Sequence, residues 1–549
     1  MSDQTTSLAA RVAAGALSAL IVLALVAALW ATAMLRPWQP VRTRAEQPAS
    51  STPWTAVNPI GVNTFLAREV ELWKRERTVE MISAMGAGWI KEHVAWSEIE
   101  PEDDVYWDAK YQQDSWAKYD QIVGLAEQHG LRVIARIDQT PHWARPQALD
   151  ASAPPIDIEK FGDFIEEFVR HFQGRVGFLQ IWNEPNLASE WGGSIDPAGY
   201  AELLDEASRR ARAVDPNVVI LSAPLAMTTE NSERAMDELS YWEALYDLGV
   251  AEHFDIVSAN AYGLDQPYDE PAEPGTLNIR RIELLHELMV RHGDGDKAIW
   301  LNEYGWNASP PDFPADGLTW SRVSDSAQAE WTAEGISYAR SAWPWFGVAS
   351  IWYFRQVGDI SPTRSEYYFR MVDLEFTPRE VYWSVQALGR RLRVGRPGVY
   401  RALEAPIIPF GGWTVAHKSS GDAGAIYGEP GDRLLIRVDG AELRVRLDPE
   451  QSGGTLAVEV FSGSEPEGPS RQRVIQIEPG QVEVTVNVDE STQAQTVHAV
   501  RLTVQPESQV AVSGIEISYQ RDFRYVLLAL GTLAVALAGR LLLGRRNAG

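Results

Sequence analysis

The sequence predicts an α/β protein: a (β/α)₈ TIM barrel, then an all-β, jelly-roll-like sandwich, with a transmembrane helix at each end of the chain. Eight short apolar strand candidates alternate with helical patterns between residues 60 and 353, as a barrel of this kind requires. Beyond residue 397 the pattern changes to short alternating strands separated by Gly, Pro and Asp turns, which is typical of a sandwich. Long apolar runs stand near both termini.

The first apolar run covers residues 12–35 and contains no charged side chain. It is long enough to cross about 30 Å of hydrocarbon as a helix, so we interpret residues 1–36 as a membrane anchor. A cleaved signal peptide is the alternative, although its apolar core would be only about 7 to 15 residues long. Residues 37–57 are rich in Pro, Ser, Thr and charge, which indicates a linker.

We assign residues 58–396 to the barrel because strand and helix patterns alternate there. The strand candidates lie at residues 60–62, 89–90, 133–135, 178–181, 218–221, 256–257, 299–301 and 349–353. The clearest helix has large apolar side chains at spacings of 3 and 4, which places them on one face. These side chains are Phe161, Phe164, Ile165, Phe168, Val169 and Phe172. The last barrel helix is expected over residues 378–390.

Residues 397–520 are predicted to form the sandwich, which could serve as a carbohydrate-binding module or as a passive spacer. The second apolar run, residues 525–544, follows directly and is broken only by Arg540. Its Leu and Ala residues surround the helix without leaving a polar face, which favours a transmembrane helix over a buried amphipathic one.

Composition excludes several classes of function. The chain has 49 basic and 75 acidic residues, for a net charge of −26, and such a chain repels nucleic acid. It has no cysteine, which rules out disulfides, thiolate metal sites and cysteine catalysis. The nine histidines are scattered without the spacing of metal ligands. We therefore expect neither a metal nor a cofactor.

Two of the strand candidates end in a carboxylate. Glu184 follows the strand at 178–181, and Glu303 follows the strand at 299–301. The active site of a TIM barrel lies at the carboxyl ends of its strands, so both acids are expected there. Glycoside hydrolysis needs two carboxylates, one to protonate the leaving oxygen and one to attack or to activate water. The sequence therefore predicts a glycoside hydrolase with Glu184 and Glu303 as its catalytic residues.

These residues resemble a known clan. Asn183-Glu184-Pro185 on strand four and Glu303 on strand seven are similar to the acid/base and nucleophile of the large clan of retaining glycoside hydrolases built on such barrels. The phrases GAGWIK at 86–91, WSEIEP at 96–101 and TPHWA at 140–144 are similar to its branch of beta-xylosidases and alpha-L-iduronidases. The resemblance covers about residues 58–391, and it implies double displacement with retention of configuration.

The resemblance also implies roles in binding the substrate. Asn183 would donate a hydrogen bond to the sugar 2-hydroxyl, Tyr262 would hydrogen-bond the nucleophile, and Trp352 would form a platform for the sugar ring. The remaining substrate-binding candidates are His142, Asn260, Lys91 and Trp306. Many relatives carry Arg in place of Lys91 and His in place of Asn260, so the polar frame around the nucleophile is altered and the identity of the sugar stays open.

The expected substrate is an oligo- or polysaccharide, and nucleic acid is not expected as a partner. Because polymeric glycans are mostly extracellular, the sequence predicts a location in the cell membrane, with the lipid bilayer as a partner and the barrel on the extracellular side. Two alternative functions stay open: a membrane-tethered carbohydrate-binding protein without turnover, and a transglycosylase that uses the same residues.

Overall fold

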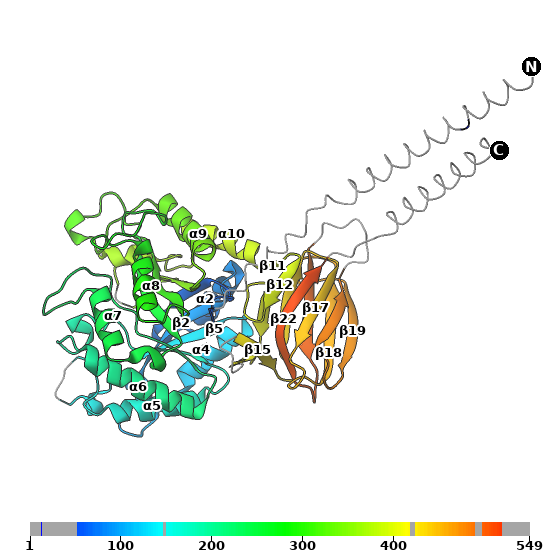
Figure 1. Ribbon diagram of the computed structural model, residues 1–549, viewed down its shortest axis with the longest axis horizontal. Helices are drawn as coiled ribbons and strands as arrows, with labels where there is room; N and C mark the ends of the chain where they lie inside the picture. The colour runs from blue at the N-terminus through cyan, green and yellow to red at the C-terminus, as the bar shows by residue number, and fades with distance from the viewer. Residues whose placement is uncertain are drawn as a thin grey trace, which may run out of the picture.

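The computed structural model describes residues 52–146, 150–358, 360–417, 423–488 and 497–518, together with Ala13. Figure 1 shows a barrel surrounded by helices, next to two facing β-sheets.

The barrel is a closed ring of eight parallel strands, which confirms the predicted (β/α)₈ architecture. Each strand candidate from the sequence overlaps one strand of the ring. Around the ring each strand pairs with its neighbours in chain order, and the last strand pairs with the first. In chain order the strands are β1 (Ile60–Thr64), β2 (Trp89–Ala95), β5 (Arg132–Asp138), β6 (Phe178–Ile181), β7 (Val219–Leu221), β8 (Ile256–Tyr262), β9 (Ala298–Gly305) and β10 (Phe346–Ile351).

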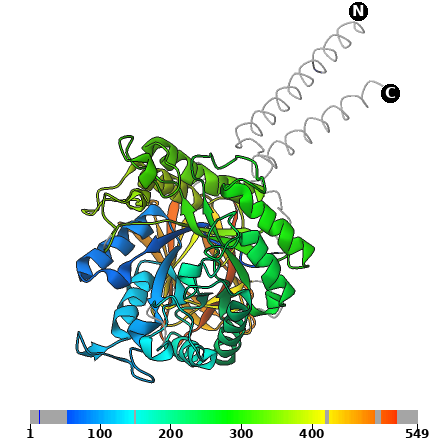
Figure 2. The same ribbon diagram turned by 90° about the vertical axis from the view of Figure 1, so that its left-hand side faces the viewer.

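Helices cover the outside of the barrel (Figure 2). The helix predicted from the spacing of phenylalanines is α5, and it buries the apolar face that the sequence indicated. The Asp157 carboxylate accepts a hydrogen bond from the Glu159 amide and so begins this helix. The long helices are α2 (Leu72–Met85), α4 (Ala117–Gln128), α5 (Ile158–His171), α6 (Pro197–Val214), α7 (Glu238–Asp247), α8 (Ile282–Arg291), α9 (Asp325–Ala342) and α10 (Glu380–Leu392).

Smaller elements extend the loop after β2. The short helix α3 (Trp96–Ile99) follows the strand directly, and β3 (Trp107–Asp108) pairs antiparallel with β4 (Gln113–Asp114).

The C-terminal part consists of two sheets, which confirms the prediction of a β-sheet domain after the barrel. Along β17 buried residues alternate with more exposed ones, as expected for a strand with one face in the core. The first sheet contains β11 (Val394–Gly395), β13 (Ile407–Phe410), β16 (Arg433–Val438), β18 (Gly454–Phe461), β19 (Ser470–Ile477) and β21 (His498–Val504). The second contains β12 (Gly398–Arg401), β14 (Thr414–His417), β15 (Ala423–Gly428), β17 (Glu442–Leu447), β20 (Glu483–Asn487) and β22 (Val510–Ser518).

An aromatic layer fills the amino-terminal end of the barrel. The ring centroids of Trp89, Phe178 and Trp300 lie 4.9 to 5.4 Å from one another. Trp54, which precedes the first strand, packs edge-on against Phe178 at 5.4 Å. This layer closes the barrel from below, so only its carboxyl end can hold a substrate.

The two sheets cover the amino-terminal end of the barrel (Figure 1). The Asn58 amide donates to the Leu403 carbonyl at 2.9 Å, and one apolar cluster includes both Trp300 of the barrel and Leu434 and Ile515 of the sheets. The carboxyl ends of the barrel strands therefore face away from the sheets.

The sequence also predicted membrane spans at residues 12–35 and 525–544, which lie outside the described residues apart from Ala13. In the part of the chain that the structure describes, no helix has the length and apolar character needed to span a membrane. This finding corrects the predicted location in the cell membrane with an extracellular barrel, which rested on the hydropathy of these two runs and on the expected location of the substrate. The described residues likewise give no support for the lipid bilayer as a partner.

Candidate active site

Glu184 and Glu303 lie at the carboxyl ends of the fourth and seventh strands of the barrel, β6 and β9. Glu184 comes three residues after β6, where the backbone turns sharply: φ is 73° at Trp182 and 47° at Glu184. Left-handed φ values are uncommon for residues other than glycine and often mark functional sites. The Glu184 amide donates to the Pro224 carbonyl at 2.9 Å, which holds this turn against the next strand.

A β-bulge in β9 positions Glu303. Along the pairing with β8, Ala259 lies opposite Leu301, but the next residue, Asn260, lies opposite Glu303. Asn302 is therefore an extra residue in β9, and a bulge of this kind re-aims the side chains that follow it.

The bulge places two consecutive polar side chains inside the barrel. Asn302 Nδ2 donates to Asn260 Oδ1 at 3.0 Å, and Glu303 accepts a hydrogen bond from Tyr262. The following residue, Tyr304, points outward, since its hydroxyl donates to the carbonyl of Thr332 in α9 at 3.0 Å.

In the described part of the chain, Glu303 accepts one hydrogen bond and forms one ion pair. The Tyr262 hydroxyl donates to its Oε2 at 2.6 Å, and Lys91 Nζ lies 3.8 Å from its Oε1. Burial raises the pKa of Tyr262, and the charge of Glu303 raises it further, so the phenol keeps its proton. Burial lowers the pKa of Lys91 to about 7, although Glu303 opposes this shift. Among the described residues, Lys91 Nζ has no hydrogen-bond partner.

Glu184 has a different environment. Its Oε1 accepts a hydrogen bond of 2.6 Å from Asn260 Nδ2. Burial raises the pKa of Glu184 to about 8, and the negative charges of Glu303 and Glu190 raise it as well. The positive charge of Arg136 lowers this pKa, but by less. At neutral pH Glu184 is therefore mostly protonated.

A chain of amides orients the donor to Glu184. Asn63 on β1 donates to the Asn302 carbonyl at 3.0 Å, Asn302 donates to Asn260 Oδ1, and Asn260 in turn donates to Glu184. Because Asn302 occupies the carbonyl oxygen of the Asn260 side chain, the Asn260 NH₂ group is the end that faces Glu184.

Asn183 lies next to Glu184 in the chain and is 6% exposed. Its Oδ1 is buried without a hydrogen-bond partner in the described part of the protein. Buried polar atoms are nearly always paired, so an unpaired acceptor beside a carboxylate marks a position where a ligand can supply the donor.

Aromatic side chains form one side of the site. Half-buried Trp352 follows β10 and meets Phe65 edge-on, with ring centroids 5.7 Å apart. The Trp352–Tyr353 peptide bond is cis. Trp320, also half-buried, stacks on Tyr262 with ring centroids 5.3 Å apart and an interplanar angle of 20°.

Two predicted site residues lie elsewhere. His142 is exposed in a short 3₁₀ helix, His142–Ala144. Trp306 is only 1% exposed, and its indole N–H donates to the Gln266 carbonyl at 2.8 Å. Neither belongs to the hydrogen-bonded group that the described residues form around the two carboxylates.

An ion-pair network next to the two carboxylates was not predicted from the sequence. Asp138 Oδ2 accepts from Arg136 Nε at 2.6 Å, and Asp138 Oδ1 lies 2.5 Å from His93 Nε2. Burial by itself would raise the pKa of Asp138, but Arg136 and His93 hold it well below its usual range. In β2 and β5 polar residues alternate with apolar ones, so that the polar side chains share one face of each strand. This alternation is the sequence signal that could have revealed the network.

The described residues contain no group of three or more His, Cys, Asp or Glu side chains that could hold a metal ion. The functional groups described around this site are two carboxylates, one phenol, one amine and several amides.

Part of the chain is similar to known proteins. Residues 50–243 match the model of the cellulase family, glycosyl hydrolase family 5; the matched range includes Glu184 and ends before Glu303. A beta-xylosidase from Geobacillus stearothermophilus is 29% identical over 96 residues, which are 16% of this chain and 18% of the relative. The chain thus aligns with less than a fifth of that relative's length.

Similar solved structures include a family 39 glycoside hydrolase from Bacteroides cellulosilyticus WH2, with a TM-score of 0.47 and 15% identity, over 83% of this chain and 82% of that one. A GH39 enzyme from Xanthomonas axonopodis pv. citri has a TM-score of 0.46 and 16% identity, over 83% of this chain and 96% of that one. The family match and the closed eight-stranded barrel together identify a glycoside hydrolase domain of the family 5-like clan in this chain.

Proposed function

We propose that this chain is a retaining glycoside hydrolase that cleaves O-glycosidic bonds of oligo- or polysaccharides by double displacement. The observation that carries the proposal is the contrast between the two carboxylates. Burial and neighbouring charge raise the pKa of Glu184 to about 8, whereas Glu303 accepts a hydrogen bond from Tyr262 and lies near the Lys91 amine. Carboxyl groups in such different environments suit the roles of acid and nucleophile.

In the first step Glu184 donates its proton to the leaving glycosidic oxygen. The Glu303 carboxylate attacks the anomeric carbon as the bond to that oxygen breaks, and a glycosyl ester forms on Glu303. The Tyr262 hydroxyl and Lys91 stabilise the negative charge of Glu303 before the attack, and they orient its two oxygens.

In the second step water replaces the carboxylate. Once Glu303 is esterified its negative charge is gone, so the repulsion that kept Glu184 protonated is weaker and the pKa of Glu184 falls. Glu184, now ionised, takes a proton from water as the water attacks the anomeric carbon, and Glu303 leaves as a carboxylate. Both carboxyl groups return to their starting states.

The remaining residues would bind the sugar. The unpaired Asn183 Oδ1 is suited to accept a hydrogen bond from the sugar 2-hydroxyl, a contact that strengthens towards the transition state. Half-buried Trp352 offers an aromatic face for the apolar face of a pyranose ring. Which sugar and which linkage fit this site is a question for a panel of aryl glycosides.

The experiment that tests the proposal is NMR of the first sugar released from an aryl glycoside. We expect the released anomer to keep the configuration of the substrate, because in a retaining enzyme the nucleophilic carboxylate should lie about 5 to 5.5 Å from the acid, too close for an intervening water. An inverted anomer would overturn the role given to Glu303.

A variant strengthens the test. Glu303→Ala should lose turnover, and added azide should then occupy the vacated space and yield a glycosyl azide of inverted configuration. Glu330→Ala, at an exposed position of α9, is the matched control and should release sugar normally without an azide product. If neither aryl glycosides nor oligosaccharides react while the chain binds them, the barrel is a binding protein; transfer to acceptor sugars would instead indicate a transglycosylase.

A further inference from the structure

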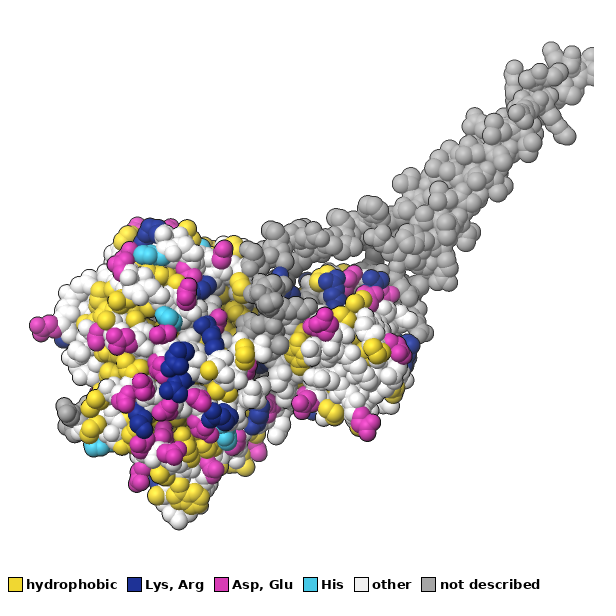
Figure 3. All heavy atoms as spheres, turned by 60° about the horizontal axis from the view of Figure 1, so that its bottom comes forward, with side chains coloured by type: hydrophobic (Ala, Val, Ile, Leu, Met, Phe, Trp, Pro, Cys, Tyr) yellow, Lys and Arg dark blue, Asp and Glu magenta, His cyan; other side chains and the backbone are white. Residues whose placement is uncertain are grey.

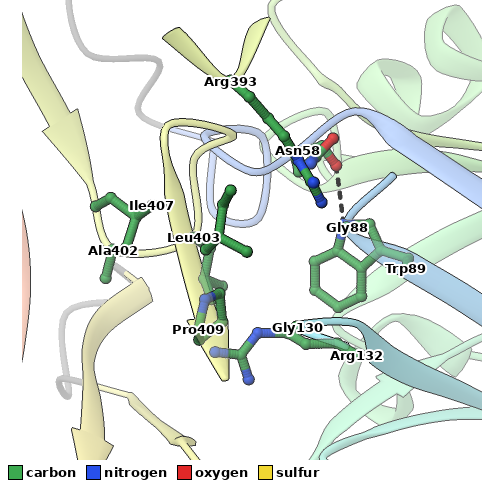
Figure 4. A pocket seen from close by; sticks show the side chains of 11 residues that line it. Asn58, Gly88, Trp89, Gly130, Arg132, Arg393, Ala402, Leu403, Ile407 and Pro409 are labelled. Atoms are coloured by element: carbon green, nitrogen blue, oxygen red, sulfur yellow. Dashed lines mark hydrogen bonds between the residues drawn. The ribbon is translucent and has the colours of Figure 1, made fainter. Parts of the chain in front are cut away.

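A cavity of about 20 Å³ lies where the C-terminal sheets cover the amino-terminal end of the barrel (Figure 4). Trp89 and Arg132 line it from the barrel, and Arg393, Leu403 and Pro409 line it from the segment that leads into the sheets. Roughly 10 to 15 Å³ suffices for one water-sized particle. The cavity therefore holds a single small occupant, and it lies at the opposite end of the barrel from Glu184 and Glu303.

Two arginines enter this cavity from different sides (Figure 4). Arg132 Nη1 donates to the Trp413 carbonyl at 3.3 Å, but its Nη2 is buried without a hydrogen-bond partner among the described residues. Arg393 donates to the Ser83 and Ala87 carbonyls at 2.7 Å each. Its Nε is likewise buried, and no acceptor for it lies within the described ranges. Each guanidinium thus has a buried nitrogen whose N–H lacks an acceptor in the described part of the chain.

The charges of the two arginines are not balanced by a carboxylate in the described part of the chain. All acceptors named above are neutral carbonyl groups. The charged group that adds to the effect of burial on the pKa of Arg393 is Arg437, which is itself a cation. Arg437 has its own partner, Glu465, at 2.8 Å. Burial lowers the pKa of Arg132 to about 10 and that of Arg393 to about 9, so both stay protonated at neutral pH.

A neutral water molecule could accept the two spare hydrogen bonds, but it would leave two buried positive charges uncompensated, which is costly in an apolar setting. A monovalent anion accepts both hydrogen bonds and offsets one of the two positive charges. Its size is limited by the volume of the cavity, and the apolar wall formed by Trp89 and Leu403 favours an ion that sheds its water easily.

We propose that this cavity binds one small monovalent inorganic anion of about the size of chloride, held between Arg132 and Arg393. The anion accepts hydrogen bonds from Arg132 Nη2 and Arg393 Nε. Because Arg132 belongs to the barrel and Arg393 to the segment that enters the sheets, the bound ion joins the two parts of the protein. This role is independent of the proposed hydrolytic function.

Crystals of the full-length chain grown in sodium bromide give the direct test, since bromide replaces chloride and scatters anomalously. We expect an anomalous peak in the cavity, in contact with both guanidinium groups. A cavity that contains water only, without an anomalous peak, would show that the proposal is wrong.

Thermal unfolding tests the proposal in solution. At constant ionic strength, Tm should rise by several degrees and then level off as chloride replaces gluconate, an anion too large for the cavity, because a ligand that binds only the folded state stabilises it. Arg132→Met and Arg393→Lys should each abolish this dependence. Arg391→Met, at an exposed arginine two residues before Arg393, should keep it.

An unchanged Tm in the wild-type chain, or a chloride effect that persists in Arg132→Met, contradicts the proposal. If Arg393→Lys fails to fold because the Ser83 and Ala87 carbonyls lose their donor, the bromide crystals and Arg132→Met still decide the question.

Discussion

The hydroxyl of Tyr262 lies 2.6 Å from Oε2 of Glu303, and the two residues come from neighbouring barrel strands, β8 and β9. Trp320 stacks on the ring of Tyr262 and so limits its rotation. A hydrogen bond from a fixed phenol to a carboxylate is charge-assisted, and here it selects which oxygen of Glu303 stays free to react.

Tyr262→Phe should reduce kcat/KM for aryl glycosides by about 10- to 100-fold, because a hydrogen bond to a charged group contributes about 1.5 to 3 kcal/mol. Tyr241→Phe is the matched control, since the buried Tyr241 hydroxyl has no hydrogen-bond partner among the described residues. It should leave kcat/KM unchanged. Equal losses in both variants would mean that the Tyr262 hydroxyl has no special role.

The pH dependence of activity should reflect Glu184. Because burial and Glu303 raise the pKa of Glu184 to about 8, the acid is protonated below this pH, and kcat/KM should fall about tenfold per unit above it. In Glu184→Gln, the residual activity on substrates with good leaving groups should lose this basic limb. A basic limb that survives the substitution would have to come from another group.

Lys91→Met should separate activity from stability. Loss of the cation 3.8 Å from Glu303 should lower kcat/KM. The free energy of unfolding should not fall with it, because burial outweighs the attraction between this amine and Glu303, as the lowered pKa of Lys91 indicates. The activity assay and denaturant unfolding, both at pH 6, measure the two effects. A variant that is fully active would remove Lys91 from the site.

The same variant carries a pH signature. Burial lowers the pKa of Lys91 to about 7 in the folded chain, against about 10.4 when unfolded. Between these values the unfolded chain binds more protons, so Lys91 makes stability rise with pH across this window. This increase, on the order of a few kcal/mol, should be absent from Lys91→Met.

A double-mutant cycle with a modified substrate should locate the partner of Asn183. We expect Asn183→Ala to reduce kcat/KM by about 10- to 100-fold on an ordinary glycoside, given the usual strength of a buried hydrogen bond in a transition state. On the matching 2-deoxy glycoside it should have little effect, because the contact is already missing. Additive losses would show that Asn183 acts on another part of the sugar.

Trp320 should affect binding more than chemistry. The half-buried ring next to Tyr262 is placed to contact the substrate, so Trp320→Ala should raise KM by about tenfold, the loss expected for one apolar contact of about 1 to 2 kcal/mol. Trp383→Ala, at an exposed position of α10, is the control and should leave KM unchanged. A fall in kcat without a change in KM would mean that Trp320 only supports Tyr262.

The parts of the fold that the sequence predicted are those set by local pattern. All eight barrel strands were apolar runs, and α5 was evident from the spacing of its phenylalanines. Glu184 and Glu303 were predicted to be the catalytic pair because each ends such a run. The membrane location was the main error, and it rested on the hydropathy of residues outside the described ranges.

The supporting contacts of the site could not be predicted in this way. The extra residue at Asn302 changes the alternation of β9, and no neighbouring Gly or Pro announces it. The interaction of Arg136 with Asp138 follows from the strand period, whereas the position of Trp320 beside Tyr262 depends on the path of a long loop. Trp306 was a candidate for binding the substrate, but tertiary packing places its ring in the core.

The covered lower end of the barrel has a consequence for synthesis on the ribosome. Trp54 precedes the first barrel strand, while Leu403 and Ile515, members of the same apolar cluster, follow some 350 and 460 residues later. Translation adds roughly 5 to 20 residues per second. After β10 has been synthesised, the aromatic layer of Trp89, Phe178 and Trp300 therefore stays uncovered for several seconds or more. The barrel of this protein is thus finished by residues that the ribosome adds after its last strand.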